Sequence, residues 1–194
     1  MAERRSKVAG RVRERILGAA YDLFVQRGIN AVGVDAVLAK SRCAKASLYS
    51  NFGSKTGLVL AVLNRREQVW SKDWLEAGIR ARAATPEDRL LAVFDLLDGW
   101  CRSPDFEGCP FLHALAESTR GEPIHRAAAK HLANVRALLR DLASEAGLAE
   151  PERFARVWQM LMCGSIMAAE EGHRTAALDG KRGAQFILAG WPRR

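Results

Sequence analysis

The sequence contains no apolar run that approaches the length of a membrane span, so we expect no membrane partner. Its four cysteines form no CxxC pair, which indicates reduced thiols in a cytoplasmic protein rather than a disulfide framework. The charged segment 1–15 precedes no apolar core and is therefore not expected to be a secretory signal.

Motifs of catalysis are also missing. The chain has no Ser/His/Asp order, no phosphate-binding glycine loop and no metal-ligand pattern, so we expect neither an enzyme nor a bound cofactor or metal. A cysteine hydrolase built on Cys109 and His113 would need both residues on one short helix, which is a poor geometry for an oxyanion site.

Basic residues are concentrated in the first third of the chain. Residues 1–66 hold 13 Lys/Arg and 4 Asp/Glu, a net charge of +9, whereas residues 67–194 hold 17 and 18. Such an asymmetry suggests a module that binds a polyanion, joined to a neutral module. Nucleic acid is the leading polyanion, and an anionic membrane surface is the second.

The apolar residues follow helical spacing throughout, and no segment alternates with period two for long enough to form a strand. We therefore predict an all-α fold of about nine helices. The expected helices are one that ends before Gly28, two short ones over 34–40 and 44–51, a long one from Ser54 towards Ile79, four that open at Pro86, Pro110, Pro123 and Pro151, and a weaker one over 175–189.

The two short helices, their tight turn and the helix before them predict a helix-turn-helix, whose second helix presents its N-terminal residues to the major groove. The residues predicted to face base edges are Lys45, Ala46, Ser47 and Ser50. The residues predicted to hold phosphates are Tyr49, Asn51 and Lys55. Lys55 would begin a helix, where the dipole disfavours a cation unless an anion such as phosphate lies beside it.

Six basic residues lie in the first fifteen positions: Arg4, Arg5, Lys7, Arg11, Arg13 and Arg15. They are interpreted either as a mobile arm that contacts the DNA backbone or minor groove, or as an ordinary solubilising terminus. The sequence favours neither interpretation.

The segment 34–63 resembles the DNA-binding region of the tetracycline-repressor (TetR) family. The specific part is an LY-x-x-F core followed by S-K-x-x-L, here Leu48-Tyr49, Phe52, Ser54-Lys55 and Leu58. The resemblance covers residues 11–63 closely. It implies a homodimeric transcription regulator with a DNA-binding domain over 1–53 and a domain over 54–194 that binds a small molecule and forms the dimer.

The turn departs from the family pattern. It usually carries Gly-Val-Ser, where this chain has Arg42-Cys43-Ala44. The change removes the residue best suited to a left-handed turn and the side chain that would cap the recognition helix. Gly33 also stands where Thr is frequent, so a hydroxyl contact to phosphate is missing. We expect Arg42 to reach the DNA backbone in compensation.

The remainder, by resemblance, holds an effector cavity. The residues predicted to line it are Trp100, Cys109, Phe111, His113, Glu117, Trp158 and Met162. Its aromatic residues would suit a small apolar or aromatic effector. Plain core is the alternative for each tryptophan, and a redox-sensing thiol or a zinc site at Cys109, His113 and Glu117 is a further alternative.

The resemblance also implies that the last two helices pair across a two-fold axis. The residues predicted for this interface are Gly164, Ser165, Ala168, Gly183, Phe186 and Ile187. Small residues let helices approach closely, although packing within one subunit is the alternative. The predicted function is a ligand-released repressor that binds a palindromic operator as a homodimer; the alternatives are a thiol-based or metal-responsive regulator of the same fold, or a small-molecule-processing enzyme.

Overall fold

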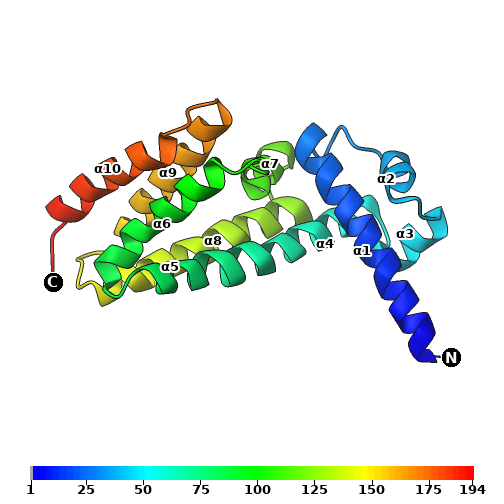
Figure 1. Cartoon of the computed structure of the whole chain (residues 1–194), viewed down its shortest axis with the longest axis horizontal. Coiled ribbons are helices and arrows are strands. Elements are labelled where there is room, and N and C mark those ends of the chain that lie inside the picture. Colours follow the sequence, from blue (N-terminus) through cyan, green and yellow to red (C-terminus); the bar gives the residue numbers. More distant parts are fainter. Residues whose placement is uncertain (1) are drawn as a thin grey trace. The chain divides into compact units, whose positions relative to one another are not determined.

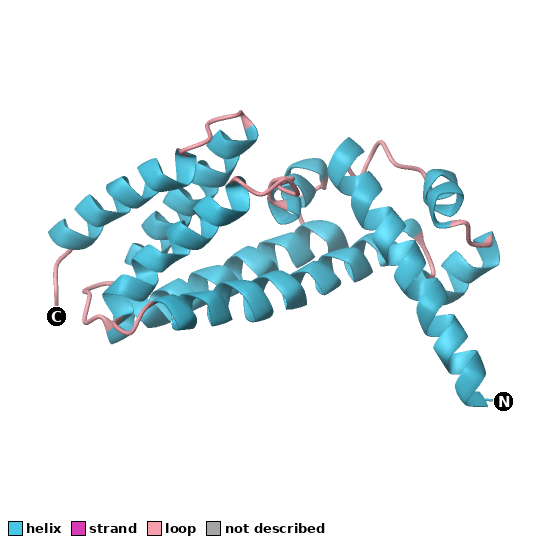
Figure 2. Cartoon of the chain, in the orientation of Figure 1, coloured by secondary structure: helices cyan, strands magenta, loops and turns pink. Residues whose placement is uncertain are grey.

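The computed structural model describes residues 2–194, with side chains at 10–71 and 73–194. These residues are mostly helical and carry no strand beyond an isolated bridge between Leu148 and Arg193 (Figure 2). The helices are α1 (Ala2–Arg27), α2 (Val34–Ser41), α3 (Lys45–Phe52), α4 (Lys55–Glu67), the π-helical segment η1 (Gln68–Glu76), α5 (Ala77–Arg82), α6 (Pro86–Cys101), α7 (Pro110–Glu117), α8 (Pro123–Glu145), α9 (Pro151–Glu170) and α10 (Ala176–Gly190) (Figure 1).

The predicted all-α fold is confirmed. The segments α4, η1 and α5 follow one another without a break, so the described residues form nine helices when this run is counted once. No helix in the described part of the chain is long and apolar enough to cross a membrane.

Local capping explains where several helices begin and end. Thr85 Oγ1 accepts a hydrogen bond from the backbone N–H of Asp88 (3.1 Å), and Pro86 follows the cap. Ser54 Oγ likewise accepts from the N–H of Gly57 (3.0 Å), which starts α4. At the end of α3, Gly53 takes a positive φ of 72° and its N–H bonds to the Tyr49 carbonyl.

The chain packs as two compact units. The first comprises Met1–Arg66 and Pro110–Ala129, and the second comprises Glu67–Cys109 and Lys130–Arg194. Helix α7 therefore packs with the N-terminal helices although it lies far from them in sequence. The functional boundary after residue 53 stays a prediction.

In the first unit, α2 and α3 pack against α1 (Figure 1). The side chains of Ile16, Leu17 and Ala20 on α1 are buried, as are Val37 on α2 and Leu48 on α3. Leu58, Val59, Val62 and Leu63 bury the inner face of α4. Removal of this apolar surface from water holds the short helices in place.

In the second unit, α10 packs against both α6 and α9 (Figure 1). The core contains Phe94, Phe154 and Trp158, all fully buried. Gly180 in α10 is buried at a close approach to α9, where a Cβ would collide with Ser165 Oγ. Burial of one face of α10 outweighs the low helix propensity of this glycine.

Candidate nucleic-acid interface

The predicted recognition helix exposes the face that the sequence assigns to DNA. Leu48 is completely buried and anchors α3 to the core of the first unit. The residues on the outer side that are exposed are Arg42, Lys45, Ala46, Tyr49 and Ser50, and those that are half-exposed are Ser47, Asn51 and Lys55. All eight predicted DNA-binding residues are therefore accessible on the α2–turn–α3 segment and the first residue of α4.

Two of the predicted donors are engaged within α3 itself. The hydroxyl of Ser50 and the amide of Asn51 both donate to the carbonyl oxygen of Ser47, at 3.1 and 2.7 Å. These bonds fix the two side chains along the helix. Lys45 lies 4.0 Å from the exposed carboxylate of Asp35, a pair too exposed to restrain it strongly.

Phe52, the last residue of α3, is half-buried. The guanidinium of Arg13 lies over its ring, 5.5 Å from the centroid. Arg13, although exposed, therefore contacts α3. Arg11 is exposed, and the side chains of Arg4, Arg5 and Lys7 lie outside the described residues.

The turn between α2 and α3 contains a left-handed residue, although its sequence lacks the glycine that adopts this conformation easily. Arg42 adopts the left-handed conformation, with φ 52° and ψ 42°, and Ala44 begins α3 without a side-chain cap. Arg15 of α1 donates from Nη2 to the carbonyl oxygens of Ser41 (2.6 Å) and Arg42 (3.1 Å). Sequence reasoning missed this contact because nothing in the local pattern links residue 15 to the turn.

Comparison with known proteins agrees with this geometry. Residues 16–62 match the family described as bacterial regulatory proteins, tetR family. The crystal structure of SCO4454, a TetR-family transcriptional regulator from Streptomyces coelicolor, is similar with a TM-score of 0.80 and 29% identity, over 89% of this chain and 93% of that chain. Residues 16–62 therefore form a TetR-type DNA-binding region, and the findings together indicate a TetR-family transcriptional regulator.

Other TetR-like proteins resemble the chain as well. A TetR-type transcriptional regulator (sav143) from Streptomyces avermitilis has a TM-score of 0.81 and 28% identity, over 92% of this chain and 97% of that chain. The transcriptional regulator QacR from Staphylococcus aureus is 32% identical over 71 residues, 37% of this chain and 38% of QacR. The chain thus matches well under half the length of that curated relative. TetR regulators are not enzymes, which confirms the expectation of a non-enzymatic protein.

The residues predicted to line a TetR effector cavity are divided between the two units. Phe111, His113 and Glu117 belong to the first unit, and the other four belong to the second. Trp158 and Met162 are buried in the core, where the Trp158 ring stacks on Phe154 with a centroid distance of 4.9 Å. The core interpretation therefore describes Trp158 better than the pocket-wall interpretation.

Trp100 belongs to an aromatic cluster within the second unit. Its ring lies 5.0 Å from Phe106, 6.0 Å from Trp70 and 6.1 Å from Trp74, between ring centroids. Trp70 and Trp74 come from the π-helical segment, a type of local distortion that is frequent at functional sites. Sequence periodicity did not reveal this segment.

A buried histidine lies beside this cluster. His131 Nδ1 donates to the carboxylate of Glu67, which also accepts from Asn134 Nδ2 at 3.0 Å. Burial raises the pKa of Glu67, but the hydrogen bonds from His131 and Asn134 outweigh it and hold this pKa below its usual value. The pair keeps two polar side chains satisfied beside the apolar rings.

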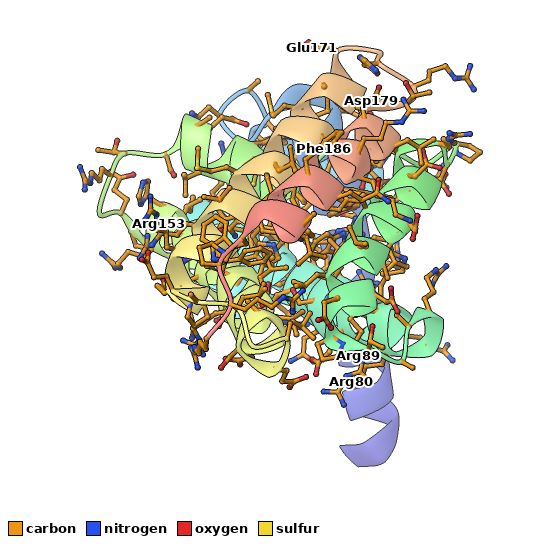
Figure 3. All side chains as sticks on the ribbon, turned by 90° about the vertical axis from the view of Figure 1, so that its left-hand side faces the viewer. Arg80, Arg89, Arg153, Glu171, Asp179 and Phe186 are labelled. Carbon is orange, nitrogen blue, oxygen red and sulfur yellow. The ribbon has the colours of Figure 1, made fainter. Side chains whose placement is uncertain are left out.

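Two cavities, one in each unit, bear on the effector prediction. In the first unit, His113 and Glu117 help to line an apolar space of only about 20 Å³, roughly one water molecule in size. In the second unit, a cavity of about 350 Å³ is lined by Arg80 and Arg89, both labelled in Figure 3, together with Glu76, Asp141 and Glu145. Its mixed charge differs from the apolar pocket expected from the sequence.

Glu117 connects α7 to the loop that precedes α2. Its carboxylate accepts from the backbone N–H of Asn30 (2.8 Å), while Asn30 Nδ2 donates to the Glu117 carbonyl oxygen (2.8 Å). Glu117, predicted as part of a pocket wall, therefore makes two hydrogen bonds to the loop that precedes α2. A movement of α7 would therefore displace that loop directly.

The predicted dimer residues lie on α9 and α10, with Phe186 labelled on α10 in Figure 3. Phe186 is 80% exposed, and Gly164 is exposed as well, whereas Ala168, Gly183 and Ile187 are half-buried. Ser165 differs, because it is buried and donates to the Leu161 carbonyl oxygen within its own helix. The sequence analysis missed Met160 and Met167, exposed side chains seven residues apart on α9.

The proposed zinc interpretation gains no support from geometry. Among the residues with described side chains, no three His, Cys, Asp or Glu groups come together as a metal site. Cys109 is buried, and its backbone N–H donates to Glu170 Oε1 at 3.1 Å.

Proposed function

We propose that this protein is a transcriptional regulator that binds double-stranded DNA through α3 and the first residue of α4. The observation that carries the proposal is the α2–turn–α3 segment, which buries Leu48 and presents the polar and basic residues of its outer face to solvent. An exposed helix of this kind on a strongly basic unit is what major-groove binding requires. A TetR-family relative, CifR, has been crystallised with a 26-bp double-strand operator DNA; it is 20% identical over 92% of this chain and 96% of that chain, with a TM-score of 0.75.

The active form would be a homodimer. The exposed Met160, Met167 and Phe186 on α9 and α10 are large apolar side chains that a monomer would leave in water. An isologous pairing of this surface would place two recognition helices about a two-fold axis. The operator would then be palindromic, with half-sites about one helical turn apart or a little more.

A small effector, apolar or aromatic, would bind the second unit and release the DNA. The half-buried rings of Trp74, Trp100 and Phe106 support an aromatic ligand. The effector acts by favouring a dimer geometry in which the recognition helices no longer match the half-sites. We place α7 on the route of this change, since Glu117 holds Asn30.

The DNA-binding proposal is tested by replacing Lys55 with alanine. Lys55 is the first residue of α4, where its ammonium and the free N–H groups would share one phosphate. We expect affinity for a duplex selected with the wild-type protein to fall about tenfold. The slope of log affinity against log salt should fall by about two, because the dimer loses two phosphate contacts.

Fluorescence anisotropy with a labelled duplex at several salt concentrations measures both effects. The matched control is Lys130→Ala, which removes an exposed lysine from α8 in the second unit. If the wild-type protein selects no duplex, the DNA-binding function is wrong. If Lys55→Ala keeps the wild-type affinity and slope, only the phosphate assignment fails.

A thiol-based sensor of the same fold is the second candidate. The repressor NemR of Escherichia coli, for which a reduced form has been crystallised, is 27% identical to this chain over 106 residues, 54% of this chain and 53% of NemR. Two of the four thiols here are poor sensors. Burial and the nearby carboxylates of Asp98 and Glu170 raise the pKa of Cys101 to about 11, and burial raises the pKa of Cys163.

Slow alkylation of Cys101 is therefore expected. The thiolate is the reactive species, and a pKa near 11 instead of the usual 9.0 reduces its fraction at neutral pH on the order of 100-fold. Mass spectrometry after iodoacetamide treatment should show Cys101 modified far more slowly than a free cysteine peptide. Raising the pH through 11 should abolish that difference if the protein stays folded. Alkylation of Cys109 without any change in DNA affinity would contradict the thiol-sensor alternative.

A further inference from the structure

The turn that leads into the recognition helix is stabilised by a residue of another helix, α1. Arg42 has a φ of 52°, a conformation in which Cβ crowds the backbone and which glycine adopts far more easily. Ala44, at the start of α3, supplies no side-chain cap. The turn therefore lacks both of the local devices that usually fix the start of such a helix.

Arg15 supports the turn from the carbonyl side. Its Nη2 donates to the carbonyl oxygens of Ser41 at 2.6 Å and Arg42 at 3.1 Å. These carbonyls lie at the end of α2, where the last C=O groups of a helix have no intrahelical partner and carry partial negative charge. A guanidinium is well suited to this place, because it is always charged and its N–H groups are donors only.

The low solvent exposure of Ser41 makes its hydrogen bond from Arg15 important for the turn. Ser41 is only 5% exposed, so its carbonyl oxygen has little access to water, and its other partner is the weak S–H donor of Cys43 at 3.4 Å. The backbone of Arg15 is held in place, because the next two residues, Ile16 and Leu17, are buried in the core. The guanidinium thus ties the turn to the most firmly packed part of α1.

We propose that Arg15 is a positioning residue for DNA recognition: it holds Arg42 in its left-handed conformation and so sets where α3 begins. It acts through the turn and does not need to touch DNA. This inference rests on the proposed DNA-binding function. It also reassigns Arg15, which the sequence placed among the basic residues of a possible arm.

The DNA experiment compares Arg15→Ala with Arg27→Ala. Arg27 is an exposed arginine at the other end of α1, so both variants lose one positive charge from the same helix. We expect Arg15→Ala to weaken binding of the selected duplex about tenfold, the usual scale for a lost hydrogen bond from a charged donor. Arg27→Ala should stay within about threefold of the wild type.

A second pair of variants separates positioning from a direct phosphate contact. Glycine at position 42 adopts a positive φ without steric cost, so the turn should keep its shape without the guanidinium. In an Arg42→Gly background, the effect of Arg15→Ala should therefore shrink to less than about threefold. A direct phosphate contact would instead give the same loss in both backgrounds and a lower salt slope.

Amide hydrogen exchange in the DNA-free protein provides a readout that does not depend on an operator. The N–H groups of Ser47 and Leu48 form the first turn of α3 by donating to the Ala44 carbonyl oxygen. We expect Arg15→Ala to speed their exchange about tenfold while Val62 and Leu63 in α4 keep their wild-type rates. Arg27→Ala should change neither pair.

The outcomes separate this inference from the proposed function. If no duplex is bound by the wild-type protein but exchange in α3 responds to Arg15→Ala, the DNA-binding function fails and the structural role of Arg15 remains. If the wild-type protein binds DNA and Arg15→Ala matches Arg27→Ala in affinity and exchange, the positioning role is overturned. Equal loss of affinity in the wild-type and Arg42→Gly backgrounds also overturns it.

Discussion

A Phe186→Glu variant should be monomeric at concentrations where the wild-type protein is a dimer. Phe186 is the most exposed of the large apolar side chains, at 80%, and it lies on α10, which packs against the helix α9 that carries the exposed Met160 and Met167. In the proposed α9–α10 interface the substitution would place two carboxylates near a two-fold axis among apolar side chains. We expect the dissociation constant of the dimer to rise by at least about 100-fold, the scale of a central interface residue.

The DNA affinity of Phe186→Glu should fall together with its dimer affinity, because two half-sites would then be occupied by separate molecules rather than by one linked pair. Sedimentation equilibrium gives the association state, and anisotropy gives the affinity. Val69→Glu is the matched control, since Val69 is an exposed apolar residue (49%) of the second unit that lies outside α9 and α10. An unchanged dimer in Phe186→Glu would show that this surface does not form the interface.

Trp158→Ala should destabilise the second unit by about 3–5 kcal/mol. Trp158 is fully buried between Phe154, on which it stacks, and Phe94, whose ring centroid lies 5.6 Å away. The truncation would leave a large cavity in a core that cannot fully close around it. Urea unfolding followed by tryptophan fluorescence measures the loss, and all five tryptophans lie in the second unit, so the signal reports on that unit alone.

Trp158→Phe is the companion variant. It keeps a buried ring and removes an indole N–H that has no hydrogen-bond partner among the described residues. We therefore expect it to lose less than half as much stability as the alanine variant. If Trp158 instead lined an open effector cavity, truncation to alanine would change the unfolding free energy by less than about 1 kcal/mol.

The sequence predicted features that depend on neighbours along the chain. The helix starts at Pro86, Pro110, Pro123 and Pro151 are all found, because capping and the fixed φ of proline are local effects. The exposed face of α3 followed from the same kind of reasoning. Burial of Leu48 dictates which side of a helix this short meets solvent.

Features that depend on distant contacts were not predictable from the pattern. Arg15 lies 26 residues from Ser41, and helical periodicity carries no information about such a pairing. A set of aromatic residues at helical spacing also reads alike in a core and in a cavity wall, which is why Trp158 was placed with the effector. The packing of α7 with the N-terminal helices depends on Glu117 and Asn30, 87 residues apart.

The proposed role of Arg15 would also make positions 15 and 42 depend on each other during evolution. A chain with arginine at 42 tolerates the left-handed turn while residue 15 supports it, whereas a chain with glycine at 42 is free to vary residue 15. Loss of Arg15 is then tolerated only when residue 42 is already glycine, so the order of the two substitutions matters. Among relatives, we expect side chains other than glycine at position 42 to occur together with a long donor at position 15.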